Sequence, residues 1–185
     1  AVAGVGPGLL RRDTTPPARG PAPSTTAPPA DTGAPVPVAR VVAYDPQGSG
    51  QAGEDDELAP RAADGNWRTE TYDQSDFFGT KTGVGLVLTL GRRSRLDSVR
   101  IDGSANGWSG SVFVLDSGSL DGFDPSRARP TAAIDDVRGQ VDVDLRGATG
   151  STVVVWITHL GDPDDGDRHR VQIDEVVPIG VPAPG

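Results

Sequence analysis

Residues Thr152–Thr158 read TVVVWIT, a run in which both faces of an extended strand would be apolar. Ser111–Leu115 (SVFVL) has the same character. Short runs of this kind, rich in β-branched and aromatic residues, are typical of strands inside a β-sheet. Both segments are therefore predicted to be central strands, and they decide the fold class.

Further strands are predicted around these two from alternation with a period of two. Gly85–Leu90 (GLVLTL) places three leucines on one face, and Gln140–Leu145 alternates between polar and apolar residues. Similar runs occupy Val38–Tyr44, Leu96–Asp102 and Val171–Val177, with Gly, Pro, Asp and Ser clusters between them. About 140 residues with roughly seven or eight short strands and no long helical pattern predict an all-β protein, a β-sandwich or jelly roll.

The first 37 residues differ in composition from the rest of the chain. They contain nine of the 17 prolines and show no periodic apolar pattern. Such a segment cannot bury apolar surface and is expected to be a disordered, extended linker. We therefore expect residues 1–37 to be a spacer, residues 38–179 to form the sandwich and residues 180–185 to be a disordered tail. Ala1–Leu10 (AVAGVGPGLL) is either the outer end of a membrane helix or a flexible terminus.

Composition excludes several functional classes. The 185 residues include no Cys, which excludes disulfides, thiolate zinc sites and a cysteine nucleophile. A net charge of −9 with a single Lys provides no basic surface for nucleic acid. The only two histidines, His159 and His169, belong to no recognisable catalytic motif, and G-x-S-x-G, H-E-x-x-H and Walker sequences are absent. The sequence therefore predicts a protein that is not an enzyme and needs no cofactor.

Two acidic clusters could attract a cation or could be solvated loops. Glu54–Glu57 reads EDDE, and Asp162–Asp167 reads DPDDGD. The second cluster is partly similar to a calcium-binding loop, but Pro163 breaks the spacing and the final bidentate Glu is missing. No metal site is predicted from either cluster.

Glu175 poses a sharper question. In Val171–Val176 (VQIDEV), strict alternation places Glu175 on the same face as Ile173, which should be the core face. A buried carboxylate needs a cation or hydrogen-bond donors, because burying it unpaired costs several kcal/mol. Either a bulge shifts the alternation and exposes Glu175, or the carboxylate closes a site with Arg61 or Arg68 as its partner. We favour the partner.

Aromatic residues supply the candidate binding surface. Trp67 lies at a predicted strand start in NWRTETY (66–72) and Trp156 lies within TVVVWIT, and both are expected in the core. Trp108 lies in a segment of small polar residues (SANGWSG), where it would either stack on a sugar ring or fold back as a lid over the end of the sandwich. Phe77 and Phe78, in the segment DQSDFFGTKT, pose the same alternatives.

Several short motifs between Ala43 and Leu90, and one near the C-terminus, resemble a known family when they are taken together. They are YDPQG (44–48), ELAP (57–60), DGNWRTETY (64–72), FG (78–79), GVGLVL (83–88) and RVQIDEV (170–176). The combination resembles the discoidin-like (coagulation-factor type C) domain at the extracellular end of actinobacterial membrane proteins. It is most similar to the C-terminal domain of MviN/MurJ-type lipid II flippases fused to a pseudokinase, and related domains occur on receptor-type Ser/Thr kinases.

The resemblance implies an eight-stranded jelly roll joined by its Pro-rich stalk to a preceding transmembrane helix, at the extracellular face of the cytoplasmic membrane. It also implies a non-catalytic module that recognises peptidoglycan or its precursors. Loops at one end of the sandwich would then present Trp108, Tyr72, Phe78 and Arg168 to the ligand. The alternative is a structural or protein-interaction domain that positions the membrane protein and has no small ligand.

Relatives with a longer turn (D-G-D-P-x-T-x-W) often bind calcium there, together with a Glu of the last strand. Here Asp64-Gly65-Asn66 runs directly into Trp67. Only Asp64 and Glu175 match possible side-chain ligands, whereas calcium takes six or more oxygen ligands. We therefore predict that no metal is bound.

Overall fold

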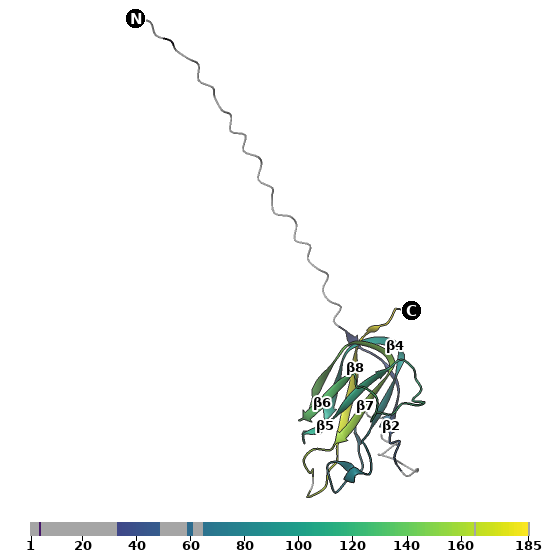
Figure 1. Cartoon of the computed structure of the whole chain (residues 1–185), viewed down its shortest axis with the longest axis vertical. Helices are drawn as coiled ribbons and strands as arrows, with labels where there is room; N and C mark the ends of the chain where they lie inside the picture. The colour runs from purple at the N-terminus through teal and green to yellow at the C-terminus, as the bar shows by residue number, and fades with distance from the viewer. Residues whose placement is uncertain (1–3, 5–32, 49–58, 61–64, 165, 185) are drawn as a thin grey trace. The chain divides into compact units, whose positions relative to one another are not determined.

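The computed structural model describes residues 4, 33–48, 59–60, 65–164 and 166–184. All of the strands belong to one compact unit, Asp31–Gly185, which is drawn in Figure 1. The described residues form strands and short 3-10 turns but no α-helix, and they contain no helical segment long and apolar enough to cross a membrane. The all-β prediction is confirmed.

Some of the sequence predictions fall on residues that the structure does not describe. These are the linker as far as residue 32, nearly all of Ala1–Leu10, the acidic cluster Glu54–Glu57, and the side chains of Arg61 and Asp64. These predictions remain predictions.

One antiparallel sheet of eight strands makes up the fold. The strands run in the order β1-β8-β4-β7-β5-β6, with β2 paired to β4 and β3 paired to β8. Their bounds are β1 (Ala34–Pro35), β2 (Val38–Tyr44), β3 (Trp67–Arg68), β4 (Val84–Gly103), β5 (Trp108–Leu115), β6 (Ala132–Val137), β7 (Val141–His159) and β8 (Gln172–Pro182), and the 3-10 turn η2 spans Phe77–Gly79.

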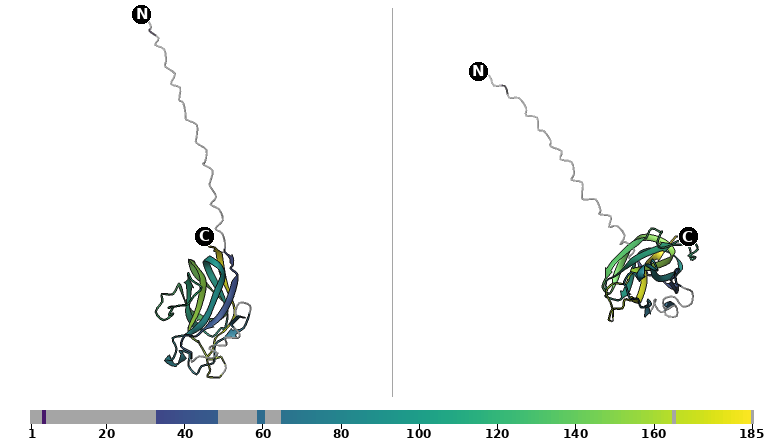
Figure 2. Two further views of the ribbon diagram at one scale, coloured as in Figure 1. Left: turned by 90° about the vertical axis from the view of Figure 1, so that its right-hand side faces the viewer. Right: turned by 60° about the horizontal axis from the view of Figure 1, so that its bottom comes forward.

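Two long strands, β4 and β7, curl the sheet into a sandwich (Figure 2). The first part of β4 pairs with β2 and with the second part of β7, whereas residues 94–103 pair with β8, and residues 94–101 also with the first part of β7. Register shifts between Thr89 and Ser94 and between Leu96 and Ser98 interrupt the ladder where the strand changes partners. Bulges bend a strand in this way. The segments that the sequence predicts as separate strands are therefore two halves of each long strand.

The two central segments have apolar residues on both faces because each face is covered. Inward-facing residues such as Val153 and Val155 join the main core between the layers. Val154 and Trp156 point the other way and join Val87 and Phe113 in a second cluster. Partly buried residues, including Tyr44, Leu120 and Phe123, pack over this second cluster, which accounts for the burial of Trp156. The expected central position of both segments is confirmed, since β7 lies between β4 and β5, and β5 lies between β7 and β6.

The boundaries of the folded region are wider than expected. β8 continues to Pro182, and Ala34–Pro35 pairs with Gly180 and Ile179. The N–H of Val36, a buried residue, donates to Pro178 O at 2.8 Å. The predicted limits at residues 37 and 180 are therefore wrong by a few residues. Pairing with β8 stabilises Ala34–Pro35, and pairing with β4 stabilises the end of β8, although neither segment carries a strand pattern of its own.

Candidate functional site

The connecting segments at one end of the sandwich, which we call the loop end, are β3–β4 (69–83), β4–β5 (104–107) and β7–β8 (160–171). In Figure 1 the C-terminus lies at the opposite end of the sheet. The β3–β4 and β7–β8 segments are joined through their backbones, because Tyr72 N–H donates to His169 O at 2.9 Å and His169 N–H donates to Tyr72 O at 2.7 Å. Leu160 N–H also donates to Ser75 O at 2.8 Å. These segments therefore form a connected surface.

Asn106 ties the β4–β5 turn to both ends of the β7–β8 segment. Its side-chain Nδ2 donates to Leu160 O at 2.8 Å and to Arg170 O at 2.9 Å. In return, Asp162 N–H donates to Asn106 O at 2.6 Å. The side-chain amide of Asn106 thus holds the two ends of the β7–β8 segment together, which limits the movement of the residues between them.

Both histidines of the chain hold the peptide units of Gly161. Gly161 N–H donates to His159 Nδ1 at 3.1 Å, and His169 Nδ1 lies 2.8 Å from Gly161 O. Gly161 has a φ of +74°, and a Cβ atom there would lie only 2.3 Å from Asn106 O. The two imidazole rings therefore support a tight turn that only glycine can make, which gives them a structural use at the loop end.

An aromatic turn lies in the β3–β4 segment, and it consists of Tyr72 and the residues of η2. Phe77 and Phe78 both have a φ of +58°, in the left-handed region. Phe77 is buried and its ring meets the Tyr72 ring edge to face at 4.9 Å, whereas Phe78 is 50% exposed. Phe78 is the one large apolar side chain exposed among the described residues. The structure thus brings Tyr72 and Phe78 into the same segment, with Phe78 directed to the surface.

Arg168 also lies at the loop end, and it is already engaged in an ion pair. Its Nε lies 3.1 Å from Asp73 Oδ1, and both side chains are more than half exposed. This pair adds a side-chain link to the backbone link between Tyr72 and His169. Since a guanidinium carries five N–H donors, Arg168 can contact a ligand at the loop end while it keeps this ion pair, or it can exchange Asp73 for the ligand.

Trp108 does not lie at the surface, so its predicted role as a stacking platform is wrong. It is the first residue of β5, it pairs with Val137 of β6, and its side chain is fully buried in the main core. Strand β5 starts directly after the turn at Gly107, and its inward-facing position places the indole under the loop end. Among the described residues, the indole Nε1 has no hydrogen-bond partner. Trp108 is therefore a strand residue of the core rather than a loop residue that covers the end of the sandwich.

Glu175 is exposed, because a bulge breaks the alternation of the last strand. Asp102 pairs with Glu175 but Gly103 pairs with Ile173, which leaves Asp174 as the extra residue. Ile173 and Val176 are consequently both buried while Glu175 faces solvent. The favoured interpretation, a buried carboxylate with an Arg partner, is wrong.

Metal ligation receives no support from the described residues. Among them, no three His, Asp or Glu side chains gather as the ligands of an ion would. In the second acidic cluster, Asp162 pairs with Arg138 at 3.4 Å and Asp164 pairs with Arg170. An exposed Glu175 does not supply the missing ligands, so the residues that the structure describes do not fit a calcium site.

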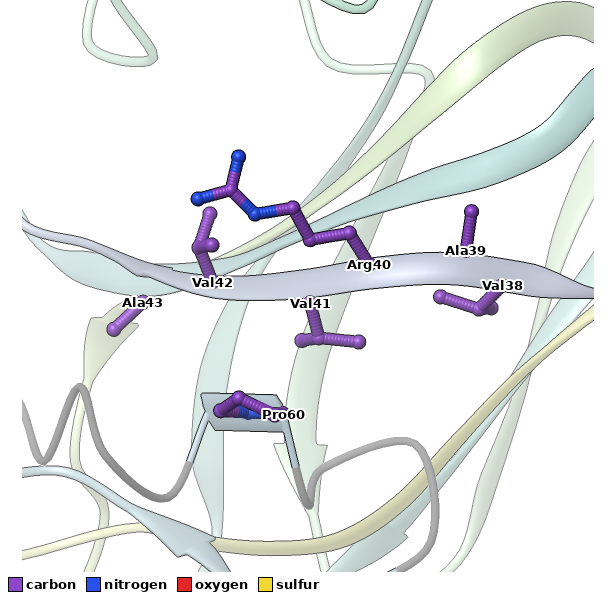
Figure 3. Close-up of a pocket in the computed structure, with 7 residues that line it drawn as sticks. All are labelled: Val38, Ala39, Arg40, Val41, Val42, Ala43 and Pro60. Atoms are coloured by element: carbon purple, nitrogen blue, oxygen red, sulfur yellow. The ribbon is translucent and has the colours of Figure 1, made fainter.

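A groove of about 670 Å³ runs beside β2. Six consecutive residues of the strand, Val38–Ala43, line it together with Pro60, and none of them is aromatic. Figure 3 shows Val41 and Ala43 directed to the side on which Pro60 lies, and the Arg40 side chain directed to the other side. Since β2 pairs only with β4 among the described strands, the groove follows an edge of the sheet.

Comparison with known proteins gives matches among solved structures only, since no family model and no curated protein matches the chain. A pectin-binding carbohydrate-binding module is similar with a TM-score of 0.51 and 13% identity, over 77% of this chain and 91% of that one. A truncated AlyQ with CBM32 and alginate lyase domains is similar with a TM-score of 0.50 and 14% identity, over 82% of this chain and 35% of that one. At such low identity the likeness concerns the fold, and the described unit has the discoidin-like β-sandwich fold.

Proposed function

We propose that this domain is a non-catalytic binding module that recognises a cell-wall glycan, or its lipid-linked precursor, through the loop end. The fold that it shares with a pectin-binding module and with a CBM32-containing protein supports this proposal. The observation that carries it is the aromatic turn, which holds one apolar ring, Phe78, half exposed at a surface made of connected loops.

The backbone conformation of this turn is energetically unfavourable, and this supports a functional use for the exposed ring. A left-handed conformation costs a non-glycine residue about 1–2 kcal/mol. The turn adopts it at two consecutive positions, Phe77 and Phe78, and yet buries only the first ring. Strain of this kind tends to persist at functional sites. An exposed ring on a fixed backbone can stack on the apolar face of a pyranose without first being ordered.

The remaining loop-end residues suit a ligand that also carries carboxylates, as peptidoglycan stems do. The ion pair between Arg168 and Asp73 is exposed, and exposed pairs contribute only about 0–1 kcal/mol. A ligand carboxylate can therefore take the place of Asp73 at small cost, with a charge-assisted hydrogen bond as its gain. Tyr72 is partly exposed and lies in the same segment as Phe78.

The wider context is part of the proposal and is supported by the sequence resemblance. The domain would stand at the extracellular face of the cytoplasmic membrane as the C-terminal part of a cell-wall biosynthesis membrane protein of the MviN/MurJ type. Protease treatment of intact spheroplasts tests this location. Cleavage of the domain from the outside is expected, and complete protection until lysis would contradict it.

Titration of the uniformly 15N-labelled chain with a purified disaccharide-peptide muropeptide and with a soluble lipid II head group tests the binding function. Amide shifts should concentrate in residues 69–83 and 160–171. Phe78→Ala should weaken binding roughly tenfold, since one stacked ring contributes about 1–1.5 kcal/mol. Phe123→Leu, which alters a ring of the second cluster, serves as the control and should bind like the wild type. Unchanged spectra at millimolar ligand, or equal affinities for the wild type and Phe78→Ala, would exclude this function.

The groove beside β2 favours a second candidate, a protein-interaction domain with no small ligand. Edge strands and aliphatic grooves accept extended peptide segments by strand addition. A photo-reactive residue in place of Ala39, which is exposed on β2, tests this candidate in cells, with the same residue in place of Arg129 as the control. One defined protein adduct from position 39 alone supports the interaction function, and no adduct counts against it.

A further inference from the structure

Lys81 is the only lysine of the chain, and it occupies a well-enclosed position beside the aromatic turn. Its side chain is 15% exposed, and its Nζ lies 2.7 Å from Asp45 Oδ2. The same Nζ lies 2.9 Å from the hydroxyl oxygen of Tyr72. Asp45 directly follows β2 and its side chain is 4% exposed. One ammonium group therefore connects the end of a core strand to the candidate ligand-binding surface.

The chemistry of this position favours an ammonium group over the guanidinium that the chain uses at its other basic positions. An ammonium group is compact and directs three donors from a single atom, so it can approach a carboxylate and a phenol oxygen together. A guanidinium is planar and wider, and it needs more room for the same two contacts. Charge matters as well, because a buried carboxylate such as Asp45 is strongly destabilising once its cation is removed.

Several contacts hold Tyr72 in place. Its backbone is bonded to His169, its ring meets Phe77 edge to face, and its hydroxyl accepts a hydrogen bond from Lys81. Phe77 is the buried residue of the strained turn, and Phe78 follows it directly. The placement of the exposed ring therefore depends, through Phe77 and Tyr72, on a cation that has no need to touch the ligand.

We infer that Lys81, together with Asp45, is a positioning pair that sets the orientation of Tyr72 and the aromatic turn for ligand binding. This inference rests on the proposed function of the loop end. It assigns Lys81 an effect on affinity beyond any effect on stability. Removing the positive charge of Lys81 should therefore disturb the orientation of Tyr72 and the aromatic turn even where the domain remains folded.

The experiment uses the full chain and compares Lys81→Met, which retains the aliphatic stem, with Lys81→Arg, which retains the charge. Lys81→Met should weaken the ring-to-ring NOEs between Tyr72 and Phe77 and should reduce muropeptide affinity at least fivefold. Lys81→Arg keeps the charge but needs more room for the same two contacts, so its affinity should lie between those of Lys81→Met and the wild type. Asp45→Asn should reproduce the effect of Lys81→Met, because it removes the other half of the pair.

A matched control separates positioning from stability. Val143→Ala creates a small cavity in the core, where Val143 of β7 pairs with Val99 of β4, and it should lower Tm. Val143 lies outside the loop-end segments. Lower affinity in Lys81→Met, against unchanged affinity in this control at a similar Tm, supports the inference. Equal affinities in Lys81→Met and the wild type, or intact NOEs in Lys81→Met, would overturn it.

Two further outcomes are also decisive. If Lys81→Met does not fold, Tyr72→Phe takes its place, since it removes the hydroxyl contact and leaves the ring; unchanged ring NOEs and affinity in Tyr72→Phe would then overturn the inference. If the wild type binds no muropeptide, the proposed function fails by itself. The ring NOEs of the Lys81 variants then still decide, without any ligand, whether Lys81 positions Tyr72.

Discussion

Replacement of Trp108 distinguishes between two roles for this residue. Its small polar neighbours in the sequence suggest a ligand-binding residue, whereas its burial implies a core residue. Truncation of a tryptophan on a binding surface would lower the affinity for the ligand but would cost the protein little stability. Trp108 is fully buried, and a tryptophan buries on the order of 200 Å². At about 25 cal/mol per Å² its burial contributes roughly 5 kcal/mol. Trp108→Ala leaves part of this contact and creates a cavity, so it should cost about 3–5 kcal/mol of the free energy of unfolding.

Trp108→Phe refines the estimate, because the indole Nε1 has no partner among the described residues. A buried unpaired donor costs about 1–3 kcal/mol. Phenylalanine removes that donor while it loses part of the ring area, and the two effects offset each other. Trp108→Phe should therefore cost less than about 1.5 kcal/mol.

Urea unfolding measures both changes, with the fluorescence of the remaining tryptophans, Trp67 and Trp156, as the signal. Muropeptide titration of the folded Trp108→Phe variant should give wild-type affinity. A loss below about 1 kcal/mol in Trp108→Ala would refute the burial argument, since no fully buried indole is removed so cheaply. A selective loss of affinity in Trp108→Phe at unchanged stability would return Trp108 to the binding surface.

Three further changes test other parts of the structure. Gly161→Ala should destabilise the loop end by more than about 1 kcal/mol and speed amide exchange in residues 160–171, because its Cβ would meet Asn106 O at a positive φ; exchange at the wild-type rate would contradict this. Burial raises the pKa of Tyr44, so the stabilisation that this residue gives is full below pH about 10 and is lost as the pH rises through the folded-state pKa. Absorbance titration at 295 nm with parallel Tm measurements should show an alkaline loss that Tyr44→Phe reduces, and an identical alkaline loss in both proteins would count against the argument. Glu175→Gln should change the free energy of unfolding by less than about 0.5 kcal/mol, whereas Ile173→Ala should cost about 2–5 kcal/mol; the reverse order in urea unfolding would mean that the bulge is absent.

The candidate site was only partly predictable from the sequence. The sequence predicts Phe78 and Arg168 at one end of the sandwich, and both residues lie in the segments of the loop end. The sequence wrongly predicts Trp108 in a loop, because small polar neighbours are typical of loops. No local pattern indicates that β5 begins at the tryptophan itself. Lys81 could have been noticed as the only lysine in an arginine-rich chain, but its partner Asp45 is 36 residues away.

The sequence by itself determined the all-β class, the central position of Thr152–Thr158 and the absence of cysteine chemistry, because these depend on local periodicity and composition. The tertiary structure decided which segments join into one bent strand, where the bulge exposes Glu175, and that Lys81 meets Tyr72. Each of these depends on the register between segments far apart in the chain. Register is set by the fit of whole layers around the core, so no single stretch of sequence specifies it.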